Sequence, residues 1–284
     1  MSTVAVIGGG IMGRGIASAL AAADHEVIVV EPYVEMSLPG VHVTADLDEA
    51  VATADLVIEA VPETMAAKEP VWTRMGEIAS DAAVLASNTS ALDIDALAAL
   101  VPHPDRVLGT HWFNPAQIVP LVEIVRGAAT SDDSVSWVHA LLTHAGKRPV
   151  EVRNSPGFVG NRIQFALIRE ALLCYEEGLA SAEDIDTIVS TSFGPRLAVL
   201  GPLANADLGG LDTYRSVLRF LSSTLGERFT VPDVLDRLVD DGRLGVKSGA
   251  GISEYDPNAA AQLIEYRDTM LAQVLATVVT KEKS

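Results

Sequence analysis

The glycine-rich run GGGIMG at residues 8–13 constrains the fold of this chain more than any other feature. It fits the pattern G-x-G-x-x-G, follows a β-branched run at residues 3–8 and opens an alanine-rich helical pattern. A second strand-like run at residues 26–31 ends in Glu31, at about the spacing of a ribose-binding carboxylate. This context predicts a β-α-β unit that binds a dinucleotide. The alternative is a structural glycine turn in another α/β fold.

Each part of the predicted unit has a physical reason. Glycines let the backbone turn tightly and approach a pyrophosphate, and a helix N-terminus offers free N–H groups and a positive dipole end. Glu31 would repel a 2′-phosphate and so favours NAD over NADP, although Arg14 beside the loop weakens that preference slightly. The cofactor contacts expected here are Gly8, Gly10, Ile11, Met12, Gly13 and Glu31.

Strand-like and helical patterns alternate along the first half of the chain. Strand candidates lie at residues 3–8, 26–31, 42–44, 56–60, 84–87, 107–111, 121–125 and 149–152. Such alternation is typical of a parallel sheet with helices on both faces. After about residue 153 the strands stop, and helices broken by Gly-Pro turns follow. We therefore predict an α/β Rossmann-type doubly wound, mostly parallel sheet over residues 1–153 and an all-α domain over residues 154–284.

Composition excludes several classes of function. The 284 residues carry 20 Lys and Arg against 38 Asp and Glu, a net charge of −18, which argues against nucleic acid and anionic membranes as partners. Cys174 is the single cysteine, so a disulfide within the chain and a cysteine-rich metal site are excluded, and no metal is expected. No basic leader or long apolar run is visible, which predicts a cytoplasmic protein.

One histidine and one glutamate stand out from their surroundings. His111 lies at the C-terminal end of a predicted strand, where open α/β sheets bind ligands, and a histidine suits a general base. Glu123 interrupts the apolar run LVEIV, and such a carboxylate is rarely buried unless paired. A His–Glu pair explains both, with Ser90 and Asn161 as neutral groups that position a substrate oxygen. The alternatives are a core histidine, a surface-facing glutamate, a helix-capping serine and a core asparagine.

Seven short segments occur in one order along the chain. They are VIGGGIMG at residues 6–13, EAVPE at 59–63, SNTS at 87–90, HWFNP at 111–115, LVE at 121–123, PGFVGNR at 156–162 and GVKSG at 245–249. In these segments and their order the chain resembles the L-3-hydroxyacyl-CoA dehydrogenase family over nearly its whole length.

The resemblance implies an NAD-dependent oxidoreductase that converts 3-hydroxyacyl-CoA to 3-oxoacyl-CoA, as in fatty acid metabolism. It implies that His111 is the catalytic base, that Glu123 pairs with it, and that Ser90 and Asn161 contact the reacting oxygen. It also implies a homodimer through the helical domain, which takes part in substrate binding. Further contacts with NAD are implied for Glu63, Lys68, Ser90 and Lys247.

Two segments depart from the acyl-CoA pattern. Only the dozen residues 32–43 follow Glu31, too few for the helical hairpin that contributes to the family's CoA site. Residues 194–203 are more similar to a branch with L-gulonate 3-dehydrogenase (lambda-crystallin) and 5-formyl-3-hydroxy-2-methylpyridine 4-carboxylate dehydrogenase. There Arg196 is either a carboxylate clamp or a surface arginine. The alternative substrates are a small free hydroxy acid, a pyridine aldehyde or an acyl group on a carrier protein. A non-catalytic NAD-binding or structural protein is the alternative of another class.

Overall fold

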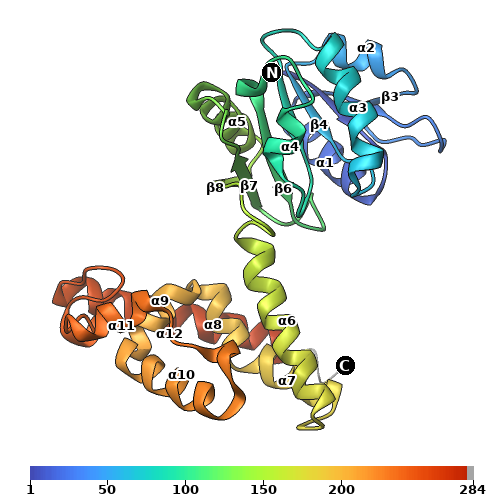
Figure 1. Cartoon of the computed structure of the whole chain (residues 1–284). Helices are drawn as coiled ribbons and strands as arrows, with labels where there is room; N and C mark the ends of the chain where they lie inside the picture. The colour runs from blue at the N-terminus through green and yellow to red at the C-terminus, as the bar shows by residue number, and fades with distance from the viewer. Residues whose placement is uncertain (280–284) are drawn as a thin grey trace. The chain divides into compact units, whose positions relative to one another are not determined.

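The computed structural model describes residues 1–279. The chain divides into two compact units, Met1–Arg169 and Glu170–Ser284 (Figure 1). The division lies inside helix α6 (Gly160–Glu176), whereas the last strand ends at Arg153. The boundary expected after residue 153 therefore marks the end of the sheet, and the first turns of α6 belong to the first compact unit.

The first unit is built on a sheet that, within the described residues, has eight strands in the order β3-β2-β1-β4-β5-β6-β7-β8. All neighbouring strands pair in parallel except β6 and β7, which are antiparallel. The bounds are β1 Thr3–Ile7, β2 Glu26–Val30, β3 Val41–Thr44, β4 Leu56–Glu59, β5 Val84–Ser87, β6 Val107–Trp112, β7 Leu121–Arg126 and β8 Arg148–Arg153. The predicted Rossmann-type, mostly parallel sheet is confirmed.

Helices cover both faces of this sheet. Successive side chains of a strand point to opposite faces, so each strand packs against helices on both sides. Val4 and Val6 of β1 pack in one buried cluster with α1 and α5, whereas Ala5 and Ile7 pack in a second cluster with α2, α3 and α4. The helix bounds are α1 Ile11–Ala21, α2 Leu47–Ala52, α3 Met65–Ile78, α4 Ile94–Ala98 and α5 Asp132–His144. Both faces of the central strands β1 and β4 are therefore buried, in keeping with their mainly apolar sequences.

The second unit is helical in the part that the structure describes. Its helices are the end of α6, α7 Ala182–Thr191, α8 Phe193–Val199, α9 Pro202–Gly209, α10 Leu211–Leu225, α11 Asp233–Asp240 and α12 Pro257–Val279. Asp207 is buried and accepts hydrogen bonds from Ile252 N at 2.9 Å, Ser253 N at 3.0 Å and the Tyr255 hydroxyl at 2.9 Å. It thereby fixes the turn that precedes α12. No helix within residues 1–279 is long and apolar enough to cross a membrane.

The segment between β2 and β3 contains no helix in the structure. Residues 31–40 form bends and turns and lead directly into Val41. The expectation that this segment is too short for a helical hairpin is confirmed.

Buried His25 gives the fold a pH dependence. Its ring packs edge-on against His144 with centroids 5.5 Å apart. Burial, then the charges of His144 and the terminal amino group, lower the pKa of His25, and the Ser2 carbonyl and Asp24 offset this only in part. The unfolded chain therefore takes up the proton first as the pH falls. The contribution of His25 to the free energy of unfolding is complete above its ordinary pKa of 6.5 and decreases below it.

We expect His25→Phe to lose part of this pH dependence, since phenylalanine fills the site without titrating. Urea unfolding of both proteins between about pH 7 and pH 5 measures the change. The natural protein should lose more stability across that interval than the variant. Equal losses in the two proteins would contradict the assignment.

Candidate active site

The glycine loop between β1 and α1 and the first turn of α1 have little room for side chains at Gly8, Gly9 and Gly13. Gly8 has φ +108°, and a Cβ there would lie 2.7 Å from the carbonyl oxygen of Ala60. A Cβ on Gly13 would collide with the carbonyl oxygen of Gly8. Gly10, which precedes α1, has nothing within 4 Å of its Cβ position. The backbone around the loop is therefore tightly packed at Gly8 and Gly13 and open at Gly10. Gly10 lies at the helix N-terminus, where backbone N–H groups bind anions.

Two alanine substitutions separate the structural glycines from the open one. We expect Gly13→Ala to lower the thermal midpoint, because its Cβ has no space against the Gly8 carbonyl. Gly10→Ala should leave the midpoint almost unchanged, because Gly10 has φ −68° and open space, and should weaken NADH binding at the helix N-terminus. Thermal unfolding and NADH titration measure the two effects. Unchanged NADH affinity in Gly10→Ala would show that the cofactor does not approach this residue.

Glu31 lies directly after β2 and contacts the glycine loop. Its Oε2 accepts a hydrogen bond from Gly9 N at 2.9 Å, and its Oε1 accepts one from Tyr33 N at 2.9 Å. A carboxylate has further lone pairs, so both contacts leave capacity for ribose hydroxyls. Glu31 also lines a surface pocket with Pro32 and Met36. The structure thus places this carboxylate beside the loop, as its sequence spacing predicts.

His111 and Glu123 face each other across the antiparallel pair β6–β7. The strand register aligns the two residues, and His111 Nδ1 lies 2.8 Å from Glu123 Oε2. Both side chains are buried, at 6% and 3% exposure. The Nδ1 contact fixes the ring orientation and leaves Nε2 as the nitrogen that can accept a proton. The structure therefore brings together the two residues that the sequence analysis paired.

The second oxygen of Glu123 is held by the start of α6. Oε1 accepts hydrogen bonds from Gly160 N at 2.8 Å and Val159 N at 3.2 Å. Burial by itself would raise the pKa of Glu123, but hydrogen bonds from His111 and these two amides outweigh it, and the pKa of Glu123 is lowered. A Cβ on Gly160 would lie 2.5 Å from the Phe113 ring, which packs on His111. Glu123 is therefore an ionised hydrogen-bond acceptor with closely packed neighbours.

A cavity of about 500 Å³ lies next to His111 within the first unit. Its lining includes Met12 from the first turn of α1, Ser90 after β5, His111 and Asn161 from α6. Asn161 Nδ2 donates to the carbonyl oxygen of Ser90 at 3.0 Å. The cavity thus extends from the first turn of α1 to the histidine and to two neutral polar side chains.

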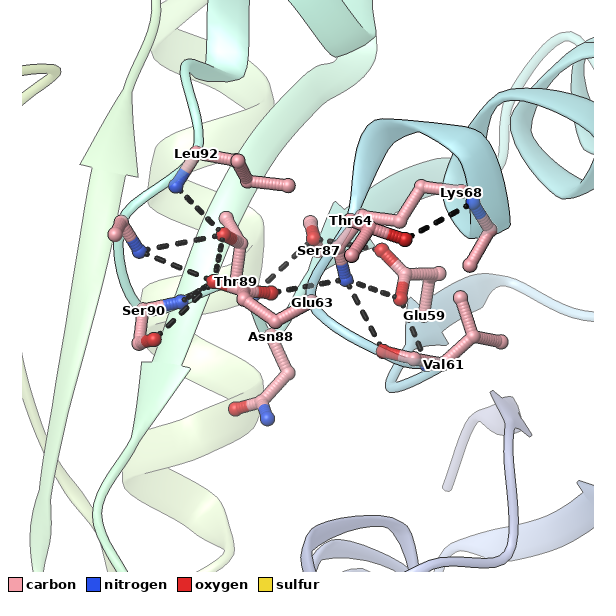
Figure 2. Close-up of polar contacts among 12 residues, drawn as sticks. Glu59, Val61, Glu63, Thr64, Lys68, Ser87, Asn88, Thr89, Ser90 and Leu92 are labelled. Carbon is pink, nitrogen blue, oxygen red and sulfur yellow. Dashed lines mark hydrogen bonds and ion pairs between the residues drawn. The ribbon is translucent and has the colours of Figure 1, made fainter.

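Glu63 fastens the loop that carries Ser90 (Figure 2). Its Oε1 accepts hydrogen bonds from the Ser90 amide at 2.7 Å, the Ser90 hydroxyl at 3.1 Å and the Thr89 hydroxyl at 2.6 Å. Burial would raise the pKa of Glu63, but hydrogen bonds from Thr89 and Ser90 and the charge of Lys68 lower it overall. Glu63 also lines the cavity, and its contact with NAD stays a prediction.

Lys68 is far less accessible than a cofactor contact suggests. Its side chain is 1% exposed, and Nζ lies 2.7 Å from Glu59 Oε1 and 3.2 Å from Glu63 Oε2. It is not among the residues that line the cavity. The structure places Lys68 behind Glu63, where its charge acts on carboxylates.

Lys247 and Arg196 lie in the second unit. Lys247 Nζ is 2.6 Å from Asp212 Oδ1, so this predicted NAD contact has an acidic partner in its own unit. Arg196 is exposed and, with Arg267, lines a cavity of about 580 Å³ between α8, α9 and α12. Their roles at the site stay predictions. Among residues 1–279, no three His, Cys, Asp or Glu side chains gather in a group that could hold a metal ion.

Glu59 is a buried residue of this network for which no role was predicted, although its sequence position carries a signal. Glu59 ends the apolar strand β4, LVIE, in the way that Glu123 interrupts LVEIV. Both strands therefore contain a buried carboxylate that needs partners.

Comparison with known proteins places this geometry in a family. The model of the 3-hydroxyacyl-CoA dehydrogenase NAD-binding domain matches residues 3–37 and 31–155, and the model of the C-terminal domain matches residues 157–255. The chain belongs to the 3-hydroxyacyl-CoA dehydrogenase family. It is accordingly an NAD-dependent oxidoreductase, and the open helix N-terminus at Gly10 together with Glu31 fits that dinucleotide.

Relatives with different substrates are similar to the chain. A 5-formyl-3-hydroxy-2-methylpyridine 4-carboxylate 5-dehydrogenase of Mesorhizobium japonicum is 35% identical over 95% of this chain and 96% of its own. A probable 3-hydroxybutyryl-CoA dehydrogenase of Bacillus subtilis is 40% identical over 80% of this chain and 78% of its own. The crystal structure of a 3-hydroxyacyl-CoA dehydrogenase from Archaeoglobus fulgidus has a TM-score of 0.83 and 34% identity, covering 96% of this chain and 99% of that one.

Proposed function

We propose that the chain oxidises the secondary hydroxyl of a 3-hydroxyacyl thioester to a 3-oxoacyl thioester, with hydride transfer to NAD. The observation that carries this proposal is the His111–Glu123 pair, with 2.8 Å between Nδ1 and Oε2, and the cavity that His111 lines together with Met12 from the first turn of α1. Family membership supports the reaction type. The names of the pyridine-carboxylate and the 3-hydroxybutyryl-CoA relatives give different substrates. The thioester substrate is therefore the part of this statement that we propose.

The side chains divide the reaction between them. Nε2 of His111 accepts the hydroxyl proton, and the charge that develops on the ring is stabilised by ionised Glu123. Ser90 and Asn161 hold the substrate oxygen, because both line the cavity and are tied to each other. NAD, when bound, would accept the hydride. In the opposite direction the same histidine returns the proton to the ketone oxygen.

A small free hydroxy acid or pyridine aldehyde is the second candidate substrate. The observation that favours it is the helix-free segment between β2 and β3 together with the 35% identity to the pyridine-carboxylate enzyme.

Steady-state oxidation of NADH distinguishes the two candidates. The protein is assayed with acetoacetyl-CoA and with acetoacetate at equal concentration, with NADPH in place of NADH as the control. We expect turnover of the thioester. Turnover of acetoacetate alone would overturn the thioester and favour the free acid, and failure of both with NADH still bound would contradict the proposed substrate class.

Glu31 is expected to set the choice of dinucleotide. Glu31→Gln removes the charge that repels a 2′-phosphate, so the ratio of kcat/KM for NADH over NADPH should fall by about tenfold. Arg14→Gln is the opposite control, because it removes the nearby cation and should raise that ratio. An unchanged ratio in Glu31→Gln would mean that its carboxylate does not reach the ribose.

Assembly and location complete the proposal. We propose a cytoplasmic homodimer, and exposed apolar side chains along α6 support the assembly. Phe165, Leu172 and Tyr175 are 59%, 61% and 57% exposed in the single chain. A second copy that covered them would bury apolar surface.

A further inference from the structure

Glu59 is a fully buried carboxylate with four hydrogen-bond donors. Its Oε1 accepts from Lys68 Nζ at 2.7 Å and from Val61 N at 2.7 Å. Its Oε2 accepts from Ser87 Oγ at 2.7 Å and from Trp72 Nε1 at 3.1 Å. The side chain is 0% exposed. Removing a charge from water costs several kcal/mol, and an apolar side chain would fill the same space without that cost. The proposed proton and hydride steps do not use Glu59.

One arm of the Glu59 network reaches the Ser90 loop through Ser87. Glu59 and Ser87 are partners in the register of β4 and β5. The hydroxyl of Ser87 donates to Glu59 and accepts from Thr89 N at 3.1 Å. The backbone adds a parallel contact, since Asn88 N donates to the Glu59 carbonyl oxygen at 2.7 Å. Glu59 therefore fixes the first residues of the loop as it leaves the sheet.

The second arm reaches the same loop through Lys68 and Glu63 (Figure 2). Lys68 Nζ lies between the two carboxylates, 2.7 Å from Glu59 and 3.2 Å from Glu63. Glu63 then holds the amide and hydroxyl of Ser90. Without Glu59, Lys68 would lose its buried partner and turn toward Glu63, which moves the carboxylate that holds Ser90.

We infer that Glu59 is a positioning residue for the reaction, because its two arms, through Ser87 and through Lys68 and Glu63, set the place of Ser90 in the cavity. The inference rests on the proposed role of Ser90 at the reacting oxygen. A displacement of about 1 Å at such a contact lowers turnover by up to about 10²-fold.

Ser87→Ala tests the first arm with little risk to the fold, since it removes one hydroxyl. Trp72→Phe is the matched control, because it removes the other hydrogen bond to the same oxygen of Glu59 and has no hydrogen bond to residues 88–91 in the described structure. We expect Ser87→Ala to lower kcat by about tenfold or more, with a smaller change in NADH affinity. Trp72→Phe should lower the thermal midpoint and leave kcat unchanged. Equal kcat losses in both variants, or none in Ser87→Ala, would overturn the inference.

Glu59→Gln tests both arms together. It should lower kcat at least as much as Ser87→Ala, and the double variant should be no slower than Glu59→Gln, since Glu59 acts on the loop through Ser87 along this arm. Additive losses in the double variant would overturn this path. If Glu59→Gln does not fold, the single Ser87 substitution and its control still decide.

Amide hydrogen exchange separates this inference from the proposed function. Exchange at residues 88–92 reports the position of the loop whatever substrate the protein takes. Ser87→Ala should exchange faster there than the natural protein and Trp72→Phe. Faster exchange without any turnover in the natural protein would reject the proposed substrates and keep the network. Normal turnover with unchanged exchange would reject the network alone.

Discussion

Replacement of His111 by alanine is expected to lower kcat by about 10² to 10⁴ while NADH affinity stays nearly the same. The variant loses the imidazole that accepts the substrate proton in the proposed reaction, whereas the glycine loop and Glu31 are untouched. Stopped-flow or steady-state turnover and NADH titration measure the two quantities on one preparation.

His139→Ala is the control for this experiment. His139 lies on the exposed face of α5 and should give the kcat of the natural protein. Full activity in His111→Ala would remove the histidine from the mechanism. Loss of NADH binding in that variant would show that the side chain supports the cofactor site rather than proton transfer.

Glu123→Gln is expected to have an effect of similar size, about 10² to 10⁴ in kcat. Glutamine keeps the volume but has no charge to stabilise a protonated His111, and it can hold the ring only by turning its amide oxygen toward Nδ1. The Gly160 and Val159 amides, which now donate to the carboxylate, would then compete for the same oxygen. Turnover with saturating NADH and substrate measures the loss.

A second glutamate of the sheet provides the comparison. Glu151 on β8 is half-exposed and pairs with Arg126, so Glu151→Gln should leave kcat unchanged. If Glu123→Gln and Glu151→Gln lost the same small amount, the buried pair would be a structural contact only.

The pairing of His111 with Glu123 could be predicted because both residues violate a local rule. Each is a polar side chain at a place where strands are otherwise apolar, and one hydrogen bond between them resolves both conflicts. The strands themselves were predictable for a related reason. In a sheet covered on both faces, runs such as VAVI of β1 are apolar throughout and end at glycine or a charge.

Other features depend on tertiary contacts that leave no local pattern. The sequence around Lys68 is that of an exposed helix, and only the fold shows that the ammonium group lies between Glu59 and Glu63. The position of the division inside α6, beyond the end of strand β8, also leaves no local sequence pattern. The compact units are defined by packing and not by the end of the sheet. The exposed apolar residues of α6 look like a core stripe in sequence, and the single chain leaves them uncovered.

Deuterium transfer from NADH that carries deuterium at both hydrogen positions of nicotinamide C4 tests the central claim most directly. The natural protein is incubated with labelled NADH and either acetoacetyl-CoA or acetoacetate, and the product is analysed by mass spectrometry. The account predicts a hydroxylated product with one deuterium on the carbon that bears the new hydroxyl, formed much more slowly by His111→Ala. A reduced product without the label, or no reduced product from either substrate, would contradict it.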